Sequence, residues 1–314
     1  MVRYFQKQGK HINELEQLTP RCWINISPPF HSVELEHLAE TLSLPIDFLI
    51  DPLDIDERTR FEVEDDVRLI VLNTPVLNES SETEILYITV PIGIITTPEH
   101  IITVSSYDTA VIRKFMQNKV RNFNPADYVL FVLQILEENV YTYLSCLKDI
   151  NVRQNTIEQD VYESSKNQDL KRLLSLEKSL VYFVTALSSN ALLKQRMQRM
   201  NLFSIQQDAE KADLLEDIII DNSQAQEMAH IYSNILKNTM DALASMISNN
   251  LNEVMKRLTL ITIILMVPTL VASFYGMNVD LPLKDEPFAF IMLVGGSIFF
   301  AASLAMFFRS KRMF

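Results

Sequence analysis

The chain has 314 residues, a length that predicts more than one structural unit. Its formal net charge of −12 disfavours a nucleic-acid partner, because phosphate binding needs a basic surface, and fits a protein that meets cations. The two cysteines, Cys22 and Cys146, share no pairing or metal-ligand motif, which favours a reducing compartment and disfavours a zinc site.

Residues 1–124 combine strand-like and helix-like segments. The first ten residues are polar and charged, so a cleaved signal peptide is not expected. Runs rich in Val, Ile and Leu predict strands over 21–26, 67–72, 84–90 and 101–104. Helices are expected over 32–42, capped by Ser32, and 108–116, capped by Asp108. This pattern predicts an α+β domain with a largely antiparallel sheet of undecided topology.

Residues 126–250 contain neither Gly nor Pro. Apolar residues spaced by three or four from Val129 to Leu147 predict a long amphipathic helix, and a second is expected over about 168–200. Together they make a helical hairpin over 125–206. A third helix, with an apolar stripe including Leu214, Ile218 and Ile235, begins near Gln207 and meets no stop signal before Pro268.

That third helix would be roughly 90–100 Å long at 1.5 Å per residue. Such a helix is a stalk, here residues 207–257, and it needs neighbours to bury its apolar stripe. Symmetric self-association is the simplest source of neighbours.

Two uncharged runs, 258–279 and 287–308, stand close to the C-terminus. Each has about the ~20 residues that cross a bilayer, so residues 258–314 predict a membrane domain with transmembrane helices over 258–278 and 287–308. Buried core helices would explain these runs less well, because uninterrupted apolar runs of this length are rare in soluble folds.

Flanking charge gives an orientation. Lys256 and Arg257 precede the first run, and Arg309, Lys311 and Arg312 follow the second, whereas the link DLPLKDE is acidic. The positive-inside rule then predicts a multi-pass protein of the cell (inner) membrane, with both termini in the cytoplasm and the acidic link outside. The residues before the first span are therefore expected to be cytoplasmic.

Polar residues recur along one face of the first span. At steps of three or four residues this face presents Asn252, Met255, Leu258 or Thr259, Thr262, Met266, Thr269 and Ser273. Such a stripe serves helix–helix contact or lines water, and alternation of polar residues with Met and Leu favours a pore with hydrophobic constrictions. The stripe holds no carboxylate, which suits a cation that keeps its water shell, such as Mg²⁺.

The outer end of the first span reads Tyr275-Gly276-Met277-Asn278. This motif, after the first of two C-terminal spans, resembles the signature of CorA-type magnesium channels. Asn252 to Met255, and Pro268 with Thr269, also resemble the family, although Ser273 stands where many relatives have Gly. The architecture matches throughout, and residues 214–278 match in sequence detail.

The resemblance implies a homopentameric, funnel-shaped channel whose first spans line one pore. Gly276, Met277 and Asn278 would form the selectivity filter, with five Asn278 carbonyl oxygens accepting hydrogen bonds from the water shell of the ion. Met255 and Leu258 would form a hydrophobic gate above Asn252. The transport implied is passive Mg²⁺ uptake into the cytoplasm, with Co²⁺ and Ni²⁺ as further substrates.

The family also senses cytoplasmic Mg²⁺ at acidic sites between subunits. Asp217 matches the stalk member of that site, and Asp51 is the candidate partner. Between Asp208 and Asp241 stand eight acidic residues and two lysines, so copies of this surface would repel until a divalent ion bridges them. A plain solvated acidic face explains any one of these residues equally well.

Other functions remain open. No GxxxxGK, HExxH or GxSxG motif is present, which disfavours an enzyme, ATP-driven transport and an organic cofactor. One alternative is a membrane-anchored cation sensor without transport. Another is a zinc transporter of the same architecture. Zinc-exporting relatives usually differ at the middle position of GMN, so Met277 favours Mg²⁺.

Overall fold

The computed structural model describes residues 1–9, 11–78, 85–163, 167–279 and 287–311. Two compact units are present, Met1–Met240 and Asp241–Phe314. Helix α6 (Ala209–Tyr275) begins in the first unit and ends in the second. The finer division at residues 124, 206 and 257 stays a prediction.

The first unit begins with a mixed sheet and its short helices. The elements are β1 (Val2–Gln8), β2 (His11–Leu15), β3 (Trp23–Ile26), α1 (Ser32–Leu42), α2 (Ile46–Ile50), the 3₁₀ helix η1 (Asp51–Leu53), β4 (Arg60–Glu64), β5 (Val67–Leu77), β6 (Tyr87–Thr96), β7 (Ile101–Val104) and α3 (Ala110–Met116). The strand order is β2-β1-β3-β7-β6-β5-β4, and only the β3–β7 pair is parallel. The largely antiparallel sheet is thus confirmed, whereas β1, β2 and β4 were not predicted.

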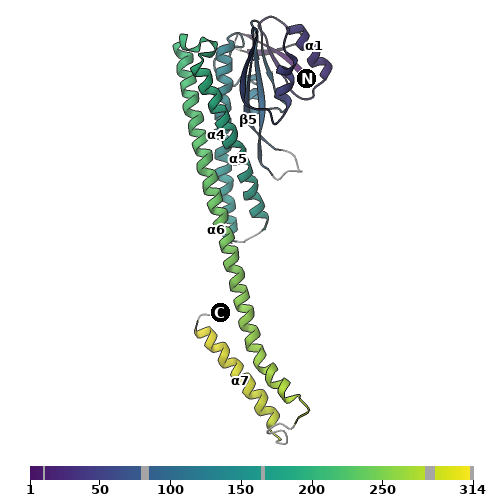
Figure 1. Ribbon diagram of the computed structural model, residues 1–314, viewed down its shortest axis with the longest axis vertical. Helices are drawn as coiled ribbons and strands as arrows, with labels where there is room; N and C mark the ends of the chain where they lie inside the picture. Colours follow the sequence, from purple (N-terminus) through teal and green to yellow (C-terminus); the bar gives the residue numbers. More distant parts are fainter. Residues whose placement is uncertain (10, 79–84, 164–166, 280–286, 312–314) are drawn as a thin grey trace. The chain divides into compact units, whose positions relative to one another are not determined.

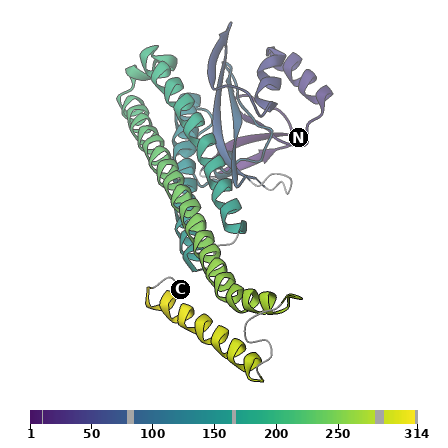
Figure 2. The same cartoon turned by 60° about the horizontal axis from the view of Figure 1, so that its bottom comes forward.

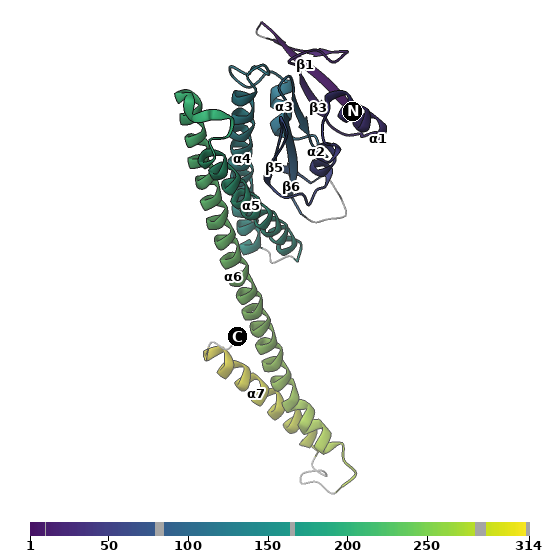
Figure 3. The same cartoon turned by 45° about the horizontal axis from the view of Figure 1, so that its top comes forward.

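Helices cover both faces of this sheet. Helices α1 and α2 pack on one face around Ile24, Leu69 and Val104. The other face meets α3 and the long helices α4 (Tyr128–Glu163) and α5 (Asn167–Arg199), as Figures 1 and 3 show. Figure 2 shows the sheet between α1 and the long helices from a second direction. Strands buried on both faces explain the nearly continuous apolar runs.

Two predicted helix caps are wrong by one residue. The N-cap of α1 is His31, which makes no side-chain cap bond, and Ser32 is already helical. The N-cap of α3 is Thr109, whose hydroxyl accepts from the Ile112 N–H at 3.4 Å. The carboxylate of Asp108 instead pairs with Arg113 at 2.7 Å. Asp108 thus pairs with a cation five residues downstream and does not cap the helix.

Helices α4 and α5 are hydrogen-bonded to the backbone of β5 at Asn73. Asn73 of β5 lies two residues beyond Val71, where the pairing of β5 with β4 ends at Arg60. The Asn73 carbonyl accepts instead from Asn190 Nδ2 (2.8 Å), Asn139 Nδ2 (3.1 Å) and the Tyr143 hydroxyl (3.1 Å). The Asn73 N–H donates to Asn190 Oδ1 at 3.1 Å. Side chains of α4 and α5 thus take the place of a strand partner.

Helix α6 follows the 3₁₀ helix η2 (Leu202–Gln207) and is capped by Asp208, whose Oδ1 accepts from the Glu210 and Lys211 N–H groups. Its buried seam in the first unit consists of Leu215, Ile218, Asn222, Ala225, Ala229 and Leu236. These residues recur at alternating steps of three and four, apart from the half-buried position 232. Ile235 of the predicted stripe lies off this seam and is 44% exposed in the single chain. Two small alanines lie in the middle of this seam, between Ile218 and Leu236.

The second unit contains two helices long and apolar enough to cross a membrane, the end of α6 and α7 (Ala289–Ser310). Helix α6 continues through Pro268 to Tyr275. Both apolar runs predicted from the sequence are therefore helical over most of their length. The acidic link, residues 280–286, and Arg312 lie outside the described residues.

Candidate functional site: the polar face of α6

All predicted pore residues from Asn252 to Ser273 lie on α6 and are exposed in the single chain. Exposure by itself does not single out their face, because only 6% of the most apolar stretch of α6 is buried. The few covered residues are therefore the informative ones.

The covered residues of α6 in the second unit share one face. Leu260 is 4% exposed, and Ile264, Val267 and Val271 are half-buried. Each stands two residues before a member of the polar stripe, namely Thr262, Met266, Thr269 and Ser273. Two residues correspond to about 200° around an α-helix. The polar stripe therefore points away from the covered face.

Helix α7 has a matching pattern. Its less exposed residues recur every three or four positions, at Ala289, Leu293, Ser297, Ala301 and Leu304. Figures 1 and 3 show α7 turning back along the end of α6. The two helices of this unit thus each have one partly covered face, and the polar stripe of α6 stays free to meet other copies or water.

The hydroxyl groups of two threonines in the stripe donate hydrogen bonds within α6. The hydroxyls of Thr262 and Thr269 each donate to the carbonyl four residues earlier, Leu258 and Leu265, at 2.9 Å. The hydroxyl lone pairs remain available as acceptors. A hydrated cation presents water hydrogens outward, so this face offers it neutral hydrogen-bond acceptors.

The Tyr275-Gly276-Met277-Asn278 motif lies where α6 ends. The Gly276 N–H donates to the Ala272 carbonyl at 3.0 Å, and the Met277 N–H donates to the Phe274 carbonyl at 3.2 Å. A Cβ on Gly276 would lie 3.3 Å from the Ala272 carbonyl oxygen. The turn is therefore tight, and Met277 and Asn278 are exposed directly after it.

Asp51 opens η1 and already has a cationic partner. Arg60 donates to its Oδ2 at 2.6 Å and also pairs with Glu57 and Glu62. The adjacent Pro52 packs against Gly93 of β6, where any Cβ would overlap the proline ring. The carboxylate of Asp51 is therefore partly neutralised within its own chain.

Asp217 lies exposed on α6 beside other carboxylates. Burial raises the pKa of Glu137 on α4, and the charges of Glu138, Asp221 and Asp217 raise it further. These acidic groups of one chain therefore repel one another. Among the described residues, no group of three or more His, Cys, Asp or Glu could hold a metal ion.

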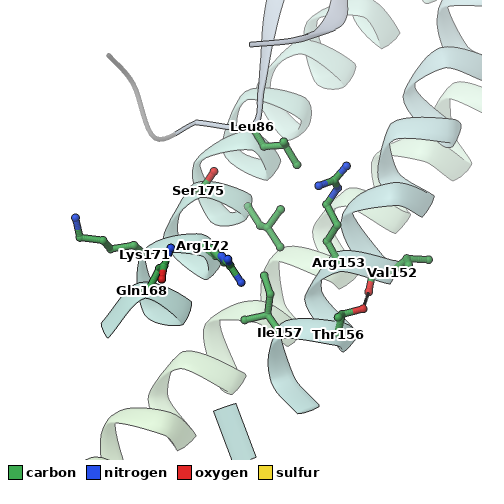
Figure 4. Close-up of a pocket in the computed structure, with 10 residues that line it drawn as sticks. Leu86, Val152, Arg153, Thr156, Ile157, Gln168, Lys171, Arg172 and Ser175 are labelled. Atoms are coloured by element: carbon green, nitrogen blue, oxygen red, sulfur yellow. Dashed lines mark hydrogen bonds between the residues drawn. The ribbon is translucent and has the colours of Figure 1, made fainter. Parts of the chain in front are cut away.

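One hollow of the first unit does not suit a cation. It has a volume of about 880 Å³ and lies between α4 and α5 (Figure 4). Its charged lining residues among those described are Arg153, Lys171 and Arg172. A cation path is therefore better sought along α6.

Sequence reasoning missed Arg60 and Glu137. Arg60 stands nine residues after Asp51 and reaches it only because β4 follows η1. Glu137 belongs to a helix separated from Asp217 by α5. No local pattern links either residue to the predicted site, and only an acidic pair at 137–138 gave a weak signal.

Known proteins that are similar to this chain were found by sequence. A family model described as CorA-like Mg²⁺ transporter protein matches residues 21–312. The cobalt/magnesium transport protein CorA of Methanocaldococcus jannaschii is 27% identical over 278 residues, which are 87% of this chain and 84% of that protein.

Solved structures share the fold. The complete CorA magnesium transporter from Methanocaldococcus jannaschii matches with a TM-score of 0.80 at 23% identity, covering 98% of this chain and 97% of that one. The cytoplasmic domain of ZntB from Vibrio parahaemolyticus matches with a TM-score of 0.60 at 13% identity, covering 79% and 98%. At these identities both likenesses concern the fold alone.

Proposed function

The chain belongs to the CorA-like Mg²⁺ transporter family, and on this premise we propose that it is a passive, Mg²⁺-gated channel for Mg²⁺ uptake into the cytoplasm. Family membership makes it a membrane transporter of Mg²⁺ or other divalent cations, as its sequence motif predicted. The observation that carries the channel proposal is the neutral polar stripe of α6, which faces away from the covered side and leads to Asn278. An inside-negative potential would drive entry.

The pore follows from these residues. Five Asn278 carbonyls at the outer mouth, with Gly276 and Met277, would accept hydrogen bonds from the water shell of the entering ion. The threonine oxygens would carry the hydrated ion onward. Met255 and Leu258, above Asn252, would block it by dewetting when the ring is narrow.

Assembly is the first requirement of this proposal. A single α6 offers one polar face, so a closed pore needs copies around an axis. We expect a homopentamer in mild detergent, measured by native mass spectrometry or light scattering. A stable monomer or dimer would contradict the pore.

The orientation and the substrates are also proposals. Lys256, Arg257, Arg309 and Lys311 support cytoplasmic termini, and the acidic link would face outward. Mg²⁺ is the proposed main substrate, with Co²⁺ and Ni²⁺ as further ones. Mg²⁺ uptake into proteoliposomes, with Zn²⁺, Co²⁺ and Ni²⁺ competed against it, tests this. Preferred Zn²⁺ flux would support the zinc transporter, and no flux would support a membrane-anchored sensor.

Regulation would involve Asp217 of one subunit and Asp51 of the next, with Mg²⁺ bridging them in the closed state. We expect Asp217→Asn to reduce the protease protection that Mg²⁺ gives, because it weakens a ligand of the closed state. We expect Asp217→Lys to retain protection without Mg²⁺, because a fixed positive charge replaces the ion.

Limited proteolysis across a Mg²⁺ titration measures this difference. An exposed acidic residue without a role would leave both variants like the wild type, and identical titration curves for the three proteins would remove Asp217 from the mechanism.

A further inference from the structure

Helix α5 places a lysine wholly inside its contact with α6. Lys194 is 0% exposed, and its Nζ donates to Asn222 Oδ1 at 2.6 Å. Asn222, also 0% exposed, donates through Nδ2 to the Leu187 carbonyl at 3.2 Å. One polar chain thus crosses from α5 to α6 and back, in the middle of the apolar seam of α6.

The surroundings of this amine are uncharged. In the seam of α6, Asn222 stands between Ile218 and Ala225, and the buried residues near Lys194 on α5 include Asn190, Leu193 and Met197. The described residues of α4 that are buried include no charged side chain.

Acidic groups do lie on the two helices beside α5. They include Glu137 and Glu138 of α4 and Asp217 and Asp221 of α6, and the charges of the other three raise the pKa of Glu137. No charge contributes to the pKa of Lys194, which burial alone lowers to about 7. Because this value lies near cytoplasmic pH, small pH changes alter the charge of the amine.

A buried ammonium would be poorly satisfied here. It has three N–H donors, and among the described residues Asn222 is its one hydrogen-bond acceptor. Opening the seam would hydrate the remaining donors. The neutral amine therefore fits the closed seam, and the ammonium favours the open one.

We propose that the Lys194–Asn222 contact is a pH-sensitive joint between α5 and α6. The neutral amine holds α6 against α5, and uptake of a solvent proton by Nζ favours separation of the two helices along this stretch. The joint goes beyond the transport proposal, because it concerns the packing of two helices and can be measured without ion flux.

The direction of the pH effect follows from linkage. The pKa of a lysine in water is about 10.4, whereas that of Lys194 in the closed seam is about 7. Between these values only the open state takes up a proton, so each unit of falling pH raises the opening equilibrium by up to about tenfold. Below pH ~7 both states are protonated, and the effect levels off.

Hydrogen exchange measured by mass spectrometry on the full chain in detergent tests the joint. Exchange is followed from pH 9.5 to 7, with times scaled for intrinsic chemical exchange. In the wild type we expect protection of α6 amides around Asn222 to fall by up to about tenfold per pH unit. Lys194→Met should abolish this slope, because no group in the seam then titrates.

Two further variants make the test decisive. Lys178→Met removes an exposed lysine from the same helix and should keep the wild-type slope. Asn222→Asp supplies a counter-charge to the buried ammonium, so the closed seam keeps its proton and the slope should again disappear. A flat wild-type profile, or an unchanged slope in Lys194→Met and Asn222→Asp, would overturn the proposal.

Discussion

Asn278→Ala is expected to reduce Mg²⁺ uptake into proteoliposomes by about a hundredfold, equivalent to about 2.7 kcal/mol. Truncation removes the ring of carbonyl oxygens at the proposed mouth, and the neighbouring Met277 and Val279 side chains have no strong acceptor to replace it. Folding and membrane insertion should be unchanged, because Asn278 is exposed and lies beyond the end of α6.

Controls separate a role in the mouth from a general defect. Asn155→Ala removes the same group from an exposed position on α4 and should transport at the wild-type rate. Gly276→Ala should give an intermediate loss, because its Cβ requires a shift of only a few tenths of an ångström against the Ala272 carbonyl. Wild-type uptake by Asn278→Ala would remove this residue from the filter.

Thr269→Cys, treated with a positively charged thiol reagent, is expected to lose at least about tenfold of its Mg²⁺ uptake. A fixed positive charge on the polar face would repel the divalent ion within the proposed pore. Val271→Cys, on the covered face about 200° away, is the matched control and should keep its uptake.

The reagent itself needs a background measurement. Cys22 is buried and Cys146 is half-buried, so we expect wild-type uptake to survive treatment. If the reagent blocked Mg²⁺ uptake by Val271→Cys and left uptake by Thr269→Cys unchanged, the pore would lie on the opposite face of α6.

Much of the architecture could be predicted because it rests on local chemistry. Strand Ile101–Val104, helix Ser32–Leu42 and the long helices follow from apolar periodicity and from the absence of Gly and Pro over 126–250. The two apolar runs follow from their length alone. The Tyr275-Gly276-Met277-Asn278 motif indicated the family because its meaning depends on its place after the first run.

What the sequence by itself determined was therefore the order and type of most elements, the two apolar helices and the family. Only the tertiary structure decided that Arg60 forms an ion pair with Asp51, that Asn190 takes the place of a strand partner at Asn73, and that Lys194 is buried against Asn222. Each of these facts joins residues from different elements, up to 117 positions apart in the chain. Periodicity reports which side of one helix or strand is apolar, whereas the charge state of a lysine depends on what the fold brings around it.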